Sequence, residues 1–348
     1  MNRTPRFPAR LDVKGGAVDL SHGSGGRAMA QLVEELFVRH LDNAWLRRGD
    51  DAAAFSVAAG RMVVSTDAHV ISPLFFPGGD IGSLAVHGTI NDVAMAGAMP
   101  SYLTASFILE EGFPLRDLGR IVASMAEASR AAEVPIVAGD TKVVERGKGD
   151  GVFITTTGVG VVPKGVEVSG DRARPGDAIL LSGTIGDHGV AVMSCREHLA
   201  FETEVRSDSA ALHGLVARMV GAVPGIRCLR DPTRGGLATT LNELALQSGV
   251  GMRVEEDRIP VAAPVVAACE LLGLDPLYVA NEGKLVCICD ADDAERLLAV
   301  MRTEPLGCEA AIIGHVVDDA QHLVQMQTAF GGQRIVDWLA GEQLPRIC

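Results

Sequence analysis

The N-terminal half of the chain alternates between segments of helical and of extended periodicity. Apolar residues recur every three or four positions over residues 27–41, 80–98 and 115–132, which predicts three helices. The second is apolar on nearly all sides, and Gly97 and Pro100 are expected to end it. Runs rich in β-branched residues predict strands at 61–67, 69–76, 102–109, 134–139 and 152–162. The order of elements across residues 45–162 indicates a mixed sheet rather than strict βαβ units.

The pattern restarts near residue 170, after a segment at 163–175 that contains two prolines and is the best candidate for a domain boundary. Beyond it, a buried strand is expected within residues 172–183, with further strands at 251–256, 284–290 and 310–317. Helices are expected at 187–199, 208–221, 233–248, 261–272 and 291–303. The whole pattern predicts an α/β (α+β) protein of two domains.

The predicted division of the chain has four parts. Residues 1–44 form an N-terminal segment with a glycine-rich loop and a helix, 45–162 a first domain, and 172–330 a second α/β domain. Residues 331–348 form a mobile tail, with a short helical stretch and an extended end. Pro345 keeps that end from continuing a helix.

Length, composition and charge indicate a two-domain globular protein that does not bind nucleic acid over a broad surface. A chain of 348 residues is longer than the roughly 250–300 at which a single core stops growing, so two domains are expected. Hydrophobic residues make up 47% and charged residues 22%, as in globular proteins. The net charge of −13 argues against a broad nucleic-acid surface and suits the gathering of divalent cations.

The cysteines and the apolar runs indicate where in the cell the protein is expected. Seven cysteines form no C-x-x-C pair, and Cys287 and Cys289 have the spacing of buried neighbours on one face of a strand. The start of the sequence has no apolar segment of the kind found in signal peptides, and no apolar run reaches about 18 residues. We therefore expect a cytoplasmic protein with reduced thiols.

Short carboxylates in apolar or glycine-rich settings are the main candidates for chemistry. The P-loop, dinucleotide and H-E-x-x-H signatures are all absent. A single aspartate after a strand is usually a turn residue or a helix cap. Asp92 differs, because it lies next to Asn91 inside an otherwise apolar helix, where a charge needs a partner or a metal ion. Several such residues together favour a magnesium–phosphate site: Asp50, Asp51, Asp67, Asp92, Asp140 and Asp231.

Two glycine-rich segments, SHGSGG (21–26) and DPTRGGL (231–237), precede predicted helices. Backbone amides at helix N-termini bind phosphate oxygens, although ordinary capping by Ser24 and Thr233 would explain the same residues. Lys142 follows a strand end, where it could neutralise a transferring phosphoryl group. Glu282 precedes a buried strand and is either an exposed turn residue or, in a cleft, a general base.

The ordered set of these motifs resembles a known superfamily. HGSGG, GDDAA, STD, NDVAMAGAMP, VAGDTKVV, DPTRGGL and NEGKL follow the order found in ATP-dependent aminoimidazole ribonucleotide synthetases, selenophosphate synthetase and thiamine monophosphate kinase. The tail GGQRIVDWLAGEQLPRIC is similar to that of the HypE family of [NiFe]-hydrogenase maturation factors. The likeness extends from about residue 14 to residue 348.

This resemblance implies a chemistry and a set of partners. Family members receive a carbamoyl group on their terminal thiol from the carbamoyltransferase HypF. With ATP and Mg²⁺ they dehydrate the thiocarboxamide to a thiocyanate, whose cyanide passes to iron on a HypC–HypD scaffold. The resemblance also implies a homodimer in which the N-terminal sheets form a shared barrel, and no nucleic-acid or membrane partner.

The same resemblance assigns roles to individual residues. Cys348 is implied as the modified thiol, with Glu282 as the base and Lys142 as the cation that act on the carboxamide. The implied nucleotide-site residues are Asp50, Asn91, Gly139, Asp140 and Thr141, and the implied magnesium ligands are Asp51, Asp67, Asp92 and Asp231.

Two other functions compete with this interpretation. The same fold could serve a small-molecule synthetase or kinase, but such enzymes need no reactive tail, and the N-terminal glycine-rich stretch lacks the cysteine of selenophosphate synthetase. A non-catalytic protein with a docking tail would leave the carboxylates unexplained. Prenylation is excluded, because Pro345 stands where that motif needs cysteine.

Overall fold

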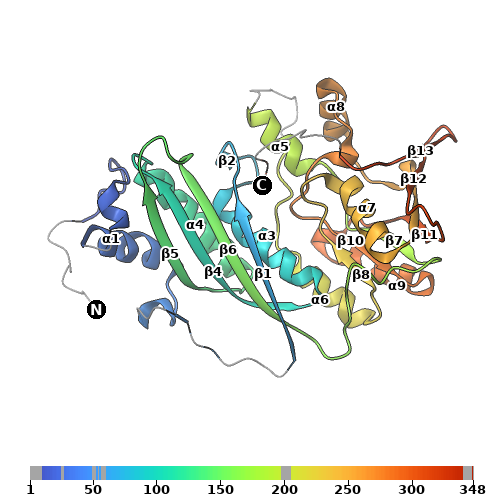
Figure 1. Cartoon of the computed structure of the whole chain (residues 1–348), viewed down its shortest axis with the longest axis horizontal. Coiled ribbons are helices and arrows are strands. Elements are labelled where there is room, and N and C mark those ends of the chain that lie inside the picture. The colour runs from blue at the N-terminus through green and yellow to red at the C-terminus, as the bar shows by residue number, and fades with distance from the viewer. Residues whose placement is uncertain are drawn as a thin grey trace.

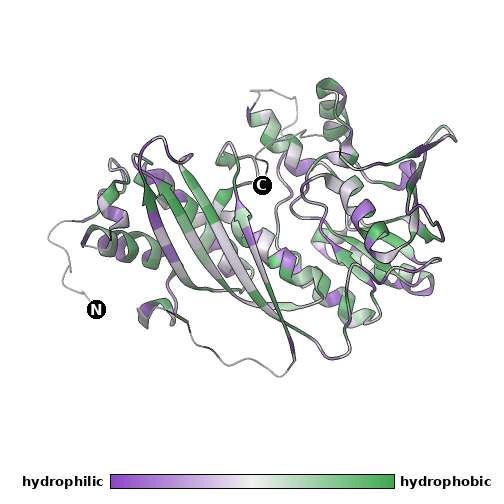
Figure 2. Cartoon of the chain, viewed as in Figure 1, coloured by the Kyte–Doolittle hydropathy of each residue, from purple (hydrophilic) through white to green (hydrophobic). Residues whose placement is uncertain are grey.

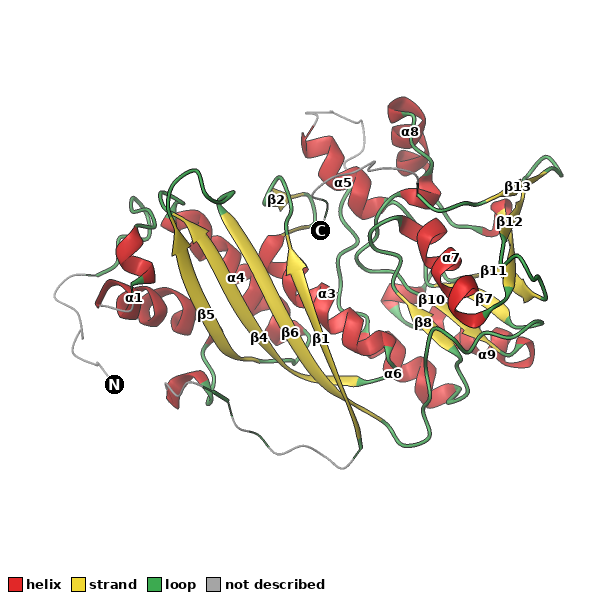
Figure 3. Cartoon of the chain, viewed as in Figure 1, coloured by secondary structure: helices red, strands yellow, loops and turns green. Residues whose placement is uncertain are grey.

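The chain folds into an N-terminal half (residues 10–162) and a C-terminal half (163–339), each built around one sheet (Figures 1 and 3). The computed structural model describes residues 10–24, 27–48, 52–53, 55, 60–196, 205–339 and 347. None of the helices in these ranges combines the length and the apolar character that a membrane-spanning helix needs.

The N-terminal sheet has four strands in the order β1-β6-β4-β5. β6 pairs antiparallel with both β1 and β4, while β4 and β5 run parallel and are connected by helix α4 (Leu115–Ala131). The sheet is therefore mixed, as the sequence predicts. The strands are β1 (Arg61–His69), β4 (Met99–Glu110), β5 (Ile136–Val144) and β6 (Val152–Val162).

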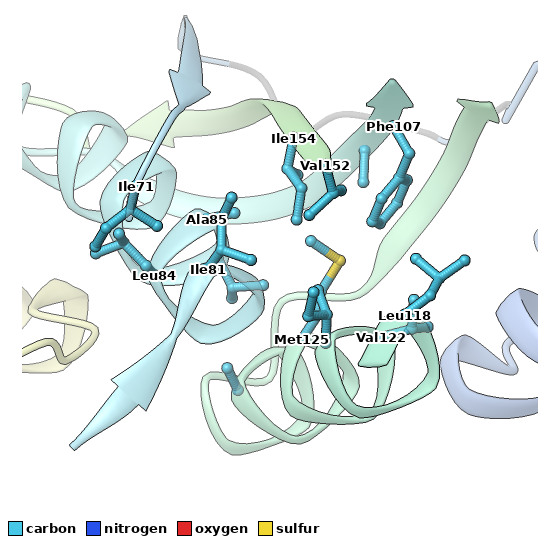
Figure 4. Close-up of a cluster of buried hydrophobic side chains, with 14 of the residues drawn as sticks. Ile71, Ile81, Leu84, Ala85, Phe107, Leu118, Val122, Met125, Val152 and Ile154 are labelled. Atoms are coloured by element: carbon cyan, nitrogen blue, oxygen red, sulfur yellow. The ribbon is translucent and has the colours of Figure 1, made fainter. Parts of the chain in front are cut away.

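Helices α4 and α3 (Ile81–Met95) lie on one face of this sheet and enclose the core (Figure 4). Met125 of α4 lies among Phe107, Val152 and Ile154 of the strands, and all four side chains are buried. Each such side chain contributes about 1.5–3 kcal/mol when fully buried. The strands carry polar as well as apolar residues (Figure 2), since only one face of the sheet is covered. Apolar side chains that remain exposed on these strands are Met62, Val64, Met99 and Ile108.

The helix expected at 27–41 is confirmed, although its middle turn is wider than an α-helix. It comprises α1 (Arg27–Leu32), the π-helical segment η2 (Val33–Val38) and α2 (Arg39–Leu41). Leu32, Leu36 and Phe37 are buried in the N-terminal core, so the predicted apolar face does pack inward. Two short 3-10 helices flank this helix, η1 (Leu20–Gly23) and η3 (Leu46–Arg48).

The C-terminal sheet has seven strands in the order β13-β12-β9-β11-β7-β10-β8. All neighbouring pairs are antiparallel except β12 and β9. The strands are β7 (Ala178–Leu181), β8 (Cys228–Arg230), β9 (Gly251–Glu255), β10 (Val286–Cys289), β11 (Ala311–Val317), β12 (Val324–Gln327) and β13 (Gln333–Ile335). The helices are α5 (Asp187–Arg196), α6 (His213–Ala222), α7 (Gly236–Ser248), α8 (Ala263–Leu272) and α9 (Ala291–Arg302), with 3-10 turns η4 (Glu256–Arg258), η5 (Pro276–Tyr278) and η6 (Pro305–Gly307).

Three expectations from the sequence are wrong. The strand expected at 69–76 is broken, because β1 ends at His69, Ile71 forms only an isolated bridge with Ile347, and the next strand is β2 (Phe75–Phe76), which pairs with β3 (Gly79–Asp80). Strands β8 and β12 were not expected, since they lack the continuous apolar run that predicts the equally short β7 and β10. The helical stretch expected after residue 330 is instead the edge strand β13.

The two halves share one apolar core and a set of hydrogen bonds. Val93 and Met95 of α3 belong to the same buried cluster as Leu215 and Met219 of α6. The amide of Asn91 donates to the Ala210 and Glu282 carbonyls, at 3.0 and 3.2 Å. Its oxygen accepts the Leu212 amide at 2.8 Å. The halves are thus packed in a fixed relation, and α3 lies at their junction (Figure 1).

Candidate active site

A cavity of about 900 Å³ lies between the two halves and collects most of the candidate carboxylates. The N-terminal half contributes Asp67 from β1 and Asp92 from α3. The C-terminal half contributes Asp231, which follows β8, and Glu282, which precedes β10. Four residues separated by up to 215 positions therefore face one space, as the predicted magnesium–phosphate site requires.

Asp92 is a half-buried residue of α3, one turn after the buried Gly88, and both line the cavity. The Ser65 hydroxyl of β1 donates a hydrogen bond to the Asp92 carboxylate at 2.9 Å. Burial raises the Asp92 pKa to about 6, with a further contribution from the negative charge of Asp67. The sequence prediction that this carboxylate needs a partner is met only in part, by one neutral hydroxyl.

Asp231 begins the glycine-rich loop that leads into α7. Burial raises its pKa to about 7, and the nearby Asp92 charge adds to the shift. Gly235 caps the helix with a φ of 82°, in the left-handed region that glycine tolerates, and no side chain caps the helix end. The alternative of a side-chain cap by Thr233 is therefore not met: its carbonyl accepts the Gly236 amide at 2.9 Å, and Thr233 and Gly235 line the cavity.

The second glycine-rich loop is different. Ser24 does not cap the following helix, because its hydroxyl donates to the Ser21 carbonyl at 2.9 Å and its backbone closes η1. Asp19 and His22 form the capping interactions of η1 instead. The loop does not line the cavity within the described part of the chain.

Glu282 is buried rather than an exposed turn residue. Its backbone amide donates to the Asp208 carboxylate at 3.0 Å, and its carbonyl accepts from Asn91. Asn281 donates to the Pro232 carbonyl at 2.8 Å, which fixes the Glu282 turn against the Asp231 loop. The Oε1 atom has no hydrogen-bond partner among the described residues. Burial, and next the charge of Asp231, raises the Glu282 pKa well above its ordinary value.

Asp67 is the most exposed of the four acids. Its Oδ1 accepts the Ala68 amide at 2.8 Å, and its Oδ2 lies 3.5 Å from the Nε2 of buried His69. In the described ranges, no three carboxylate, imidazole or thiol groups converge closely enough to hold a metal ion by themselves. A divalent cation here would complete its shell with further oxygens, as Mg²⁺ commonly does with phosphates and water.

The candidate residues on strand β5 lie away from the carboxylate cavity. Gly139, Asp140 and Thr141 border a small apolar pocket beneath α1 and η2, not the carboxylate cavity. Lys142 pairs with Asp140 at 2.9 Å, where both side chains are exposed, and this contact lowers the Asp140 pKa. β1 and β5 are opposite edges of the sheet, so Lys142 and Glu282 do not meet within one chain.

Some predicted site residues lie outside the described part of the chain, and some residues of the site were not predicted. Asp50, Asp51 and Cys348 lie outside the described residues. Asn91 forms a link between the two halves, because both ends of its amide are hydrogen-bonded. No pattern in the sequence pointed to Ser65, Asp208 or Trp338, which hold or line the site from distant elements.

Comparisons with known proteins identify the relatives of the chain. Two family models match, AIR synthase related protein N-terminal domain over residues 49–162 and C-terminal domain over residues 174–327. The carbamoyl dehydratase HypE of Cupriavidus necator is 72% identical over 339 residues, which are 97% of each chain.

Solved structures agree with these relatives. A hydrogenase maturation protein HypE in complex with ATP has a TM-score of 0.92 and 53% identity, over 94% of this chain and 99% of that one. A HypE–HypF complex has a TM-score of 0.79 and 51% identity, over 88% and 99%. The fold is therefore the two-domain AIR synthase related fold, as expected.

The raised pKa values lead to a prediction about stability. When the pKa of a carboxyl is higher in the folded than in the unfolded chain, the free energy of unfolding falls as pH rises between the two pKa values. Asp231→Asn should therefore stabilise the metal-free protein more at pH 8 than at pH 5, by about 1–3 kcal/mol, since part of the side chain still faces the open cavity. Urea unfolding in EDTA at the two pH values measures this difference.

The matched control is Asp140→Asn, because Asp140 is exposed and its pKa is lowered rather than raised. Its effect should be small, and should not favour the variant at high pH. An Asp231→Asn effect of equal size at both pH values would contradict the predicted burial of charge.

Proposed function

The chain belongs to the AIR synthase related family, among the carbamoyl dehydratases HypE, and we propose that it uses ATP to dehydrate a carboxamide carried on its own Cys348. The product is a thiocyanate that supplies cyanide for the iron centre of [NiFe]-hydrogenases. The observation that carries the proposal is the meeting of Asp92, Asp231 and Glu282 in one cavity, which the glycine-rich loop before α7 also lines.

Dehydration takes place in two steps and consumes one ATP. The carboxamide oxygen of –S–C(=O)–NH₂ attacks the γ-phosphorus of ATP, and ADP leaves. One N–H proton is lost, which gives an O-phosphorylated imidate. The C–O bond then breaks with loss of phosphate, and the second N–H proton leaves nitrogen to give –S–C≡N. The enzyme therefore needs phosphate binding, charge neutralisation and a base near nitrogen.

We place Mg²⁺ on Asp67, Asp92 and Asp231, with Asp51 as a further ligand. Three acids that share a cavity repel one another, and two of them have raised pKa values. A divalent cation shared with the triphosphate would offset this repulsion and hold the γ-phosphate near the glycine-rich loop that leads into α7. Chelation of the metal is expected to abolish dehydration.

Glu282 is the residue we propose as the base. Its unpartnered Oε1 and its burial leave it no other role in stabilising the fold. Burial, and next the charge of Asp231, raises the pKa of the Glu282 carboxyl well above its ordinary value, which favours its neutral form. A cation bound nearby would favour the ionised form of Glu282, the form that can accept a proton from the carboxamide nitrogen.

Lys142 and the Gly139–Thr141 segment need a further element to take part. Lys142 and Glu282 can act on one carboxamide only if a second copy of the chain supplies Lys142, or if the tail visits them in turn. The exposed face of the N-terminal sheet carries Met62, Val64, Met99 and Ile108, which supports a homodimer with a shared barrel of strands. We therefore propose the homodimer as the working form.

The partners and location complete the proposal. HypF as the carbamoyl donor is supported by the HypE–HypF complex of a relative with 51% identity. Delivery of cyanide to a HypC–HypD scaffold rests on the sequence resemblance. A cytoplasmic location agrees with the six cysteines of the described ranges, which are all free thiols. Likeness to thiamine monophosphate kinases, at 20% identity and a TM-score of 0.61, concerns the fold alone.

The activity is tested in two separated steps. The chain is first carbamoylated by its transferase partner, then freed of partner and nucleotide, and finally given ATP with or without Mg²⁺. We expect one carbamoyl group on Cys348, and loss of the mass of one water only with both ATP and Mg²⁺. Mass spectrometry of the intact chain follows both steps.

Two variants define the controls of that experiment. Cys348→Ser should accept no carbamoyl group. Glu282→Gln should accept it but lose water at least 100-fold more slowly, the usual contribution of a general base. Dehydration without nucleotide, or at a normal rate in Glu282→Gln, would contradict the proposal.

The homodimer has its own test. Val64→Asp places a charge on the exposed sheet face and should convert a dimer to a monomer in sedimentation velocity at micromolar concentration. Leu246→Asp, on the exposed side of α7, is the matched control and should leave the dimer intact. A wild-type chain that sediments as a monomer would contradict the proposed assembly.

A further inference from the structure

The penultimate residue of the chain is docked between the two halves. Ile347 forms a β-bridge with Ile71, just beyond β1, and its side chain is 2% exposed within the N-terminal core. Consecutive Cα atoms are 3.8 Å apart, so whatever holds Ile347 also restricts the thiol that follows it.

His188, the second residue of α5, holds the Ile347 peptide. Its Nε2 lies 2.7 Å from the Ile347 carbonyl oxygen, and its Nδ1 lies 2.8 Å from the Ser207 hydroxyl oxygen. The imidazole is fully buried and stands edge-on to Phe76. Burial lowers the His188 pKa, so the ring is neutral at physiological pH.

These contacts define which nitrogen carries the proton. The Ile347 carbonyl can only accept, so Nε2 must donate. A neutral ring then has a bare Nδ1, which accepts the Ser207 O–H. The Ser207 oxygen in turn accepts the Ser209 amide at 3.1 Å, so every polar atom of this chain of contacts is satisfied. Withdrawal of the tail would leave a buried N–H without its partner, which favours the docked position.

The residue after Ser207 holds the proposed base. The Asp208 carboxylate accepts the amides of Glu282 and Gly283, at 3.0 and 3.2 Å. It also forms a buried ion pair with Lys284 at 3.0 Å. Thus Ser207 contacts the residue that holds the tail, and Asp208 contacts the turn that carries Glu282. The two functional groups are fixed to one short segment of backbone.

We propose that His188 is a positioning residue that holds the tail in the junction for dehydration and must release it for carbamoyl transfer. The proposal rests on the proposed function, since it assumes that the tail delivers the carboxamide to Glu282. The two half-reactions then need different positions of the tail: dehydration needs the docked tail, and carbamoyl transfer needs the undocked tail, because the partner enzyme must reach Cys348. A merely structural histidine would affect both half-reactions alike or neither.

The first experiment needs neither ATP nor a partner. Iodoacetamide alkylation is followed at each cysteine by Asp-N digestion and mass spectrometry, in which the peptide beginning at Asp337 contains Cys348 alone. In His188→Leu, which lacks the donor, Cys348 should react about fivefold faster, the effect of one lost hydrogen bond. His188→Gln keeps an N–H donor and should restore much of the protection.

Internal controls separate release of the tail from loss of the fold. Exposed Cys308 should react equally fast in all variants, and buried Cys228 should stay protected. If Cys228 reacts in His188→Leu, the decisive variant is Ser207→Ala, which keeps the imidazole but removes the hydroxyl that sets its proton position. Cys348 should again react faster in that variant.

The second experiment measures both half-reactions in the same variants. Carbamoyl addition should be at least as fast as in wild type, and dehydration slower, with recovery in His188→Gln. Unchanged alkylation of Cys348 with intact controls would overturn the proposal, as would an equal slowing of both half-reactions. Failure of the proposed function looks different: faster alkylation in His188→Leu, but no dehydration even in wild type.

Discussion

The repulsion among acidic side chains in the cavity between the halves is the constraint on which the rest of the structure depends. Asp92, Asp231 and Glu282 all have raised pKa values, chiefly because of burial and secondly because of a neighbouring carboxylate, which is Asp67 for Asp92, Asp92 for Asp231 and Asp231 for Glu282. Such a cluster destabilises the folded chain near neutral pH unless a cation binds. The packing energy that holds it together comes from elsewhere, from the apolar clusters on either side.

A small number of hydrogen bonds across the junction between the halves holds these acidic residues in place. Asn91 bonds to three backbone groups of the C-terminal half, and Asn281 fixes the Glu282 turn against the loop that follows Asp231. Because each link is a hydrogen bond between buried groups, loss of one partner would leave the other unsatisfied. The site is therefore positioned by the packing of the two halves against each other, and neither half contains it alone.

The sequence was most informative where one residue contradicted its surroundings. Asp92 in an apolar helix indicated a site, and the helix, its end at Met95 and the cavity agree with that interpretation. Glu282 was ambiguous, because a turn acid before a strand looks the same whether it is exposed or buried. Only the packing of the segment at 205–212 against that turn decides the matter, and nothing local in the sequence records such a contact.

The limits of sequence reasoning have equally physical causes. β8 and β12 are as short as β7 and β10 but lack their continuous apolar run, and β13 pairs with β12 at the edge of the sheet without a strand pattern of its own. Lys142 was grouped with Glu282 by family resemblance, but the strand order places it at the opposite edge of the N-terminal sheet. Oligomeric assembly is a property of surfaces, and a linear pattern does not report it.

The most direct measurement is calorimetric titration of the protein with ATP already saturated with Mg²⁺, near pH 6.5, in buffers of different ionisation enthalpy. If the cation binds among carboxyls with pKa values of about 6 and about 7, binding must release protons, and fewer in Asp231→Asn. Binding without proton release, or with equal release in that variant, would contradict the assignment of the cavity as the magnesium–nucleotide site.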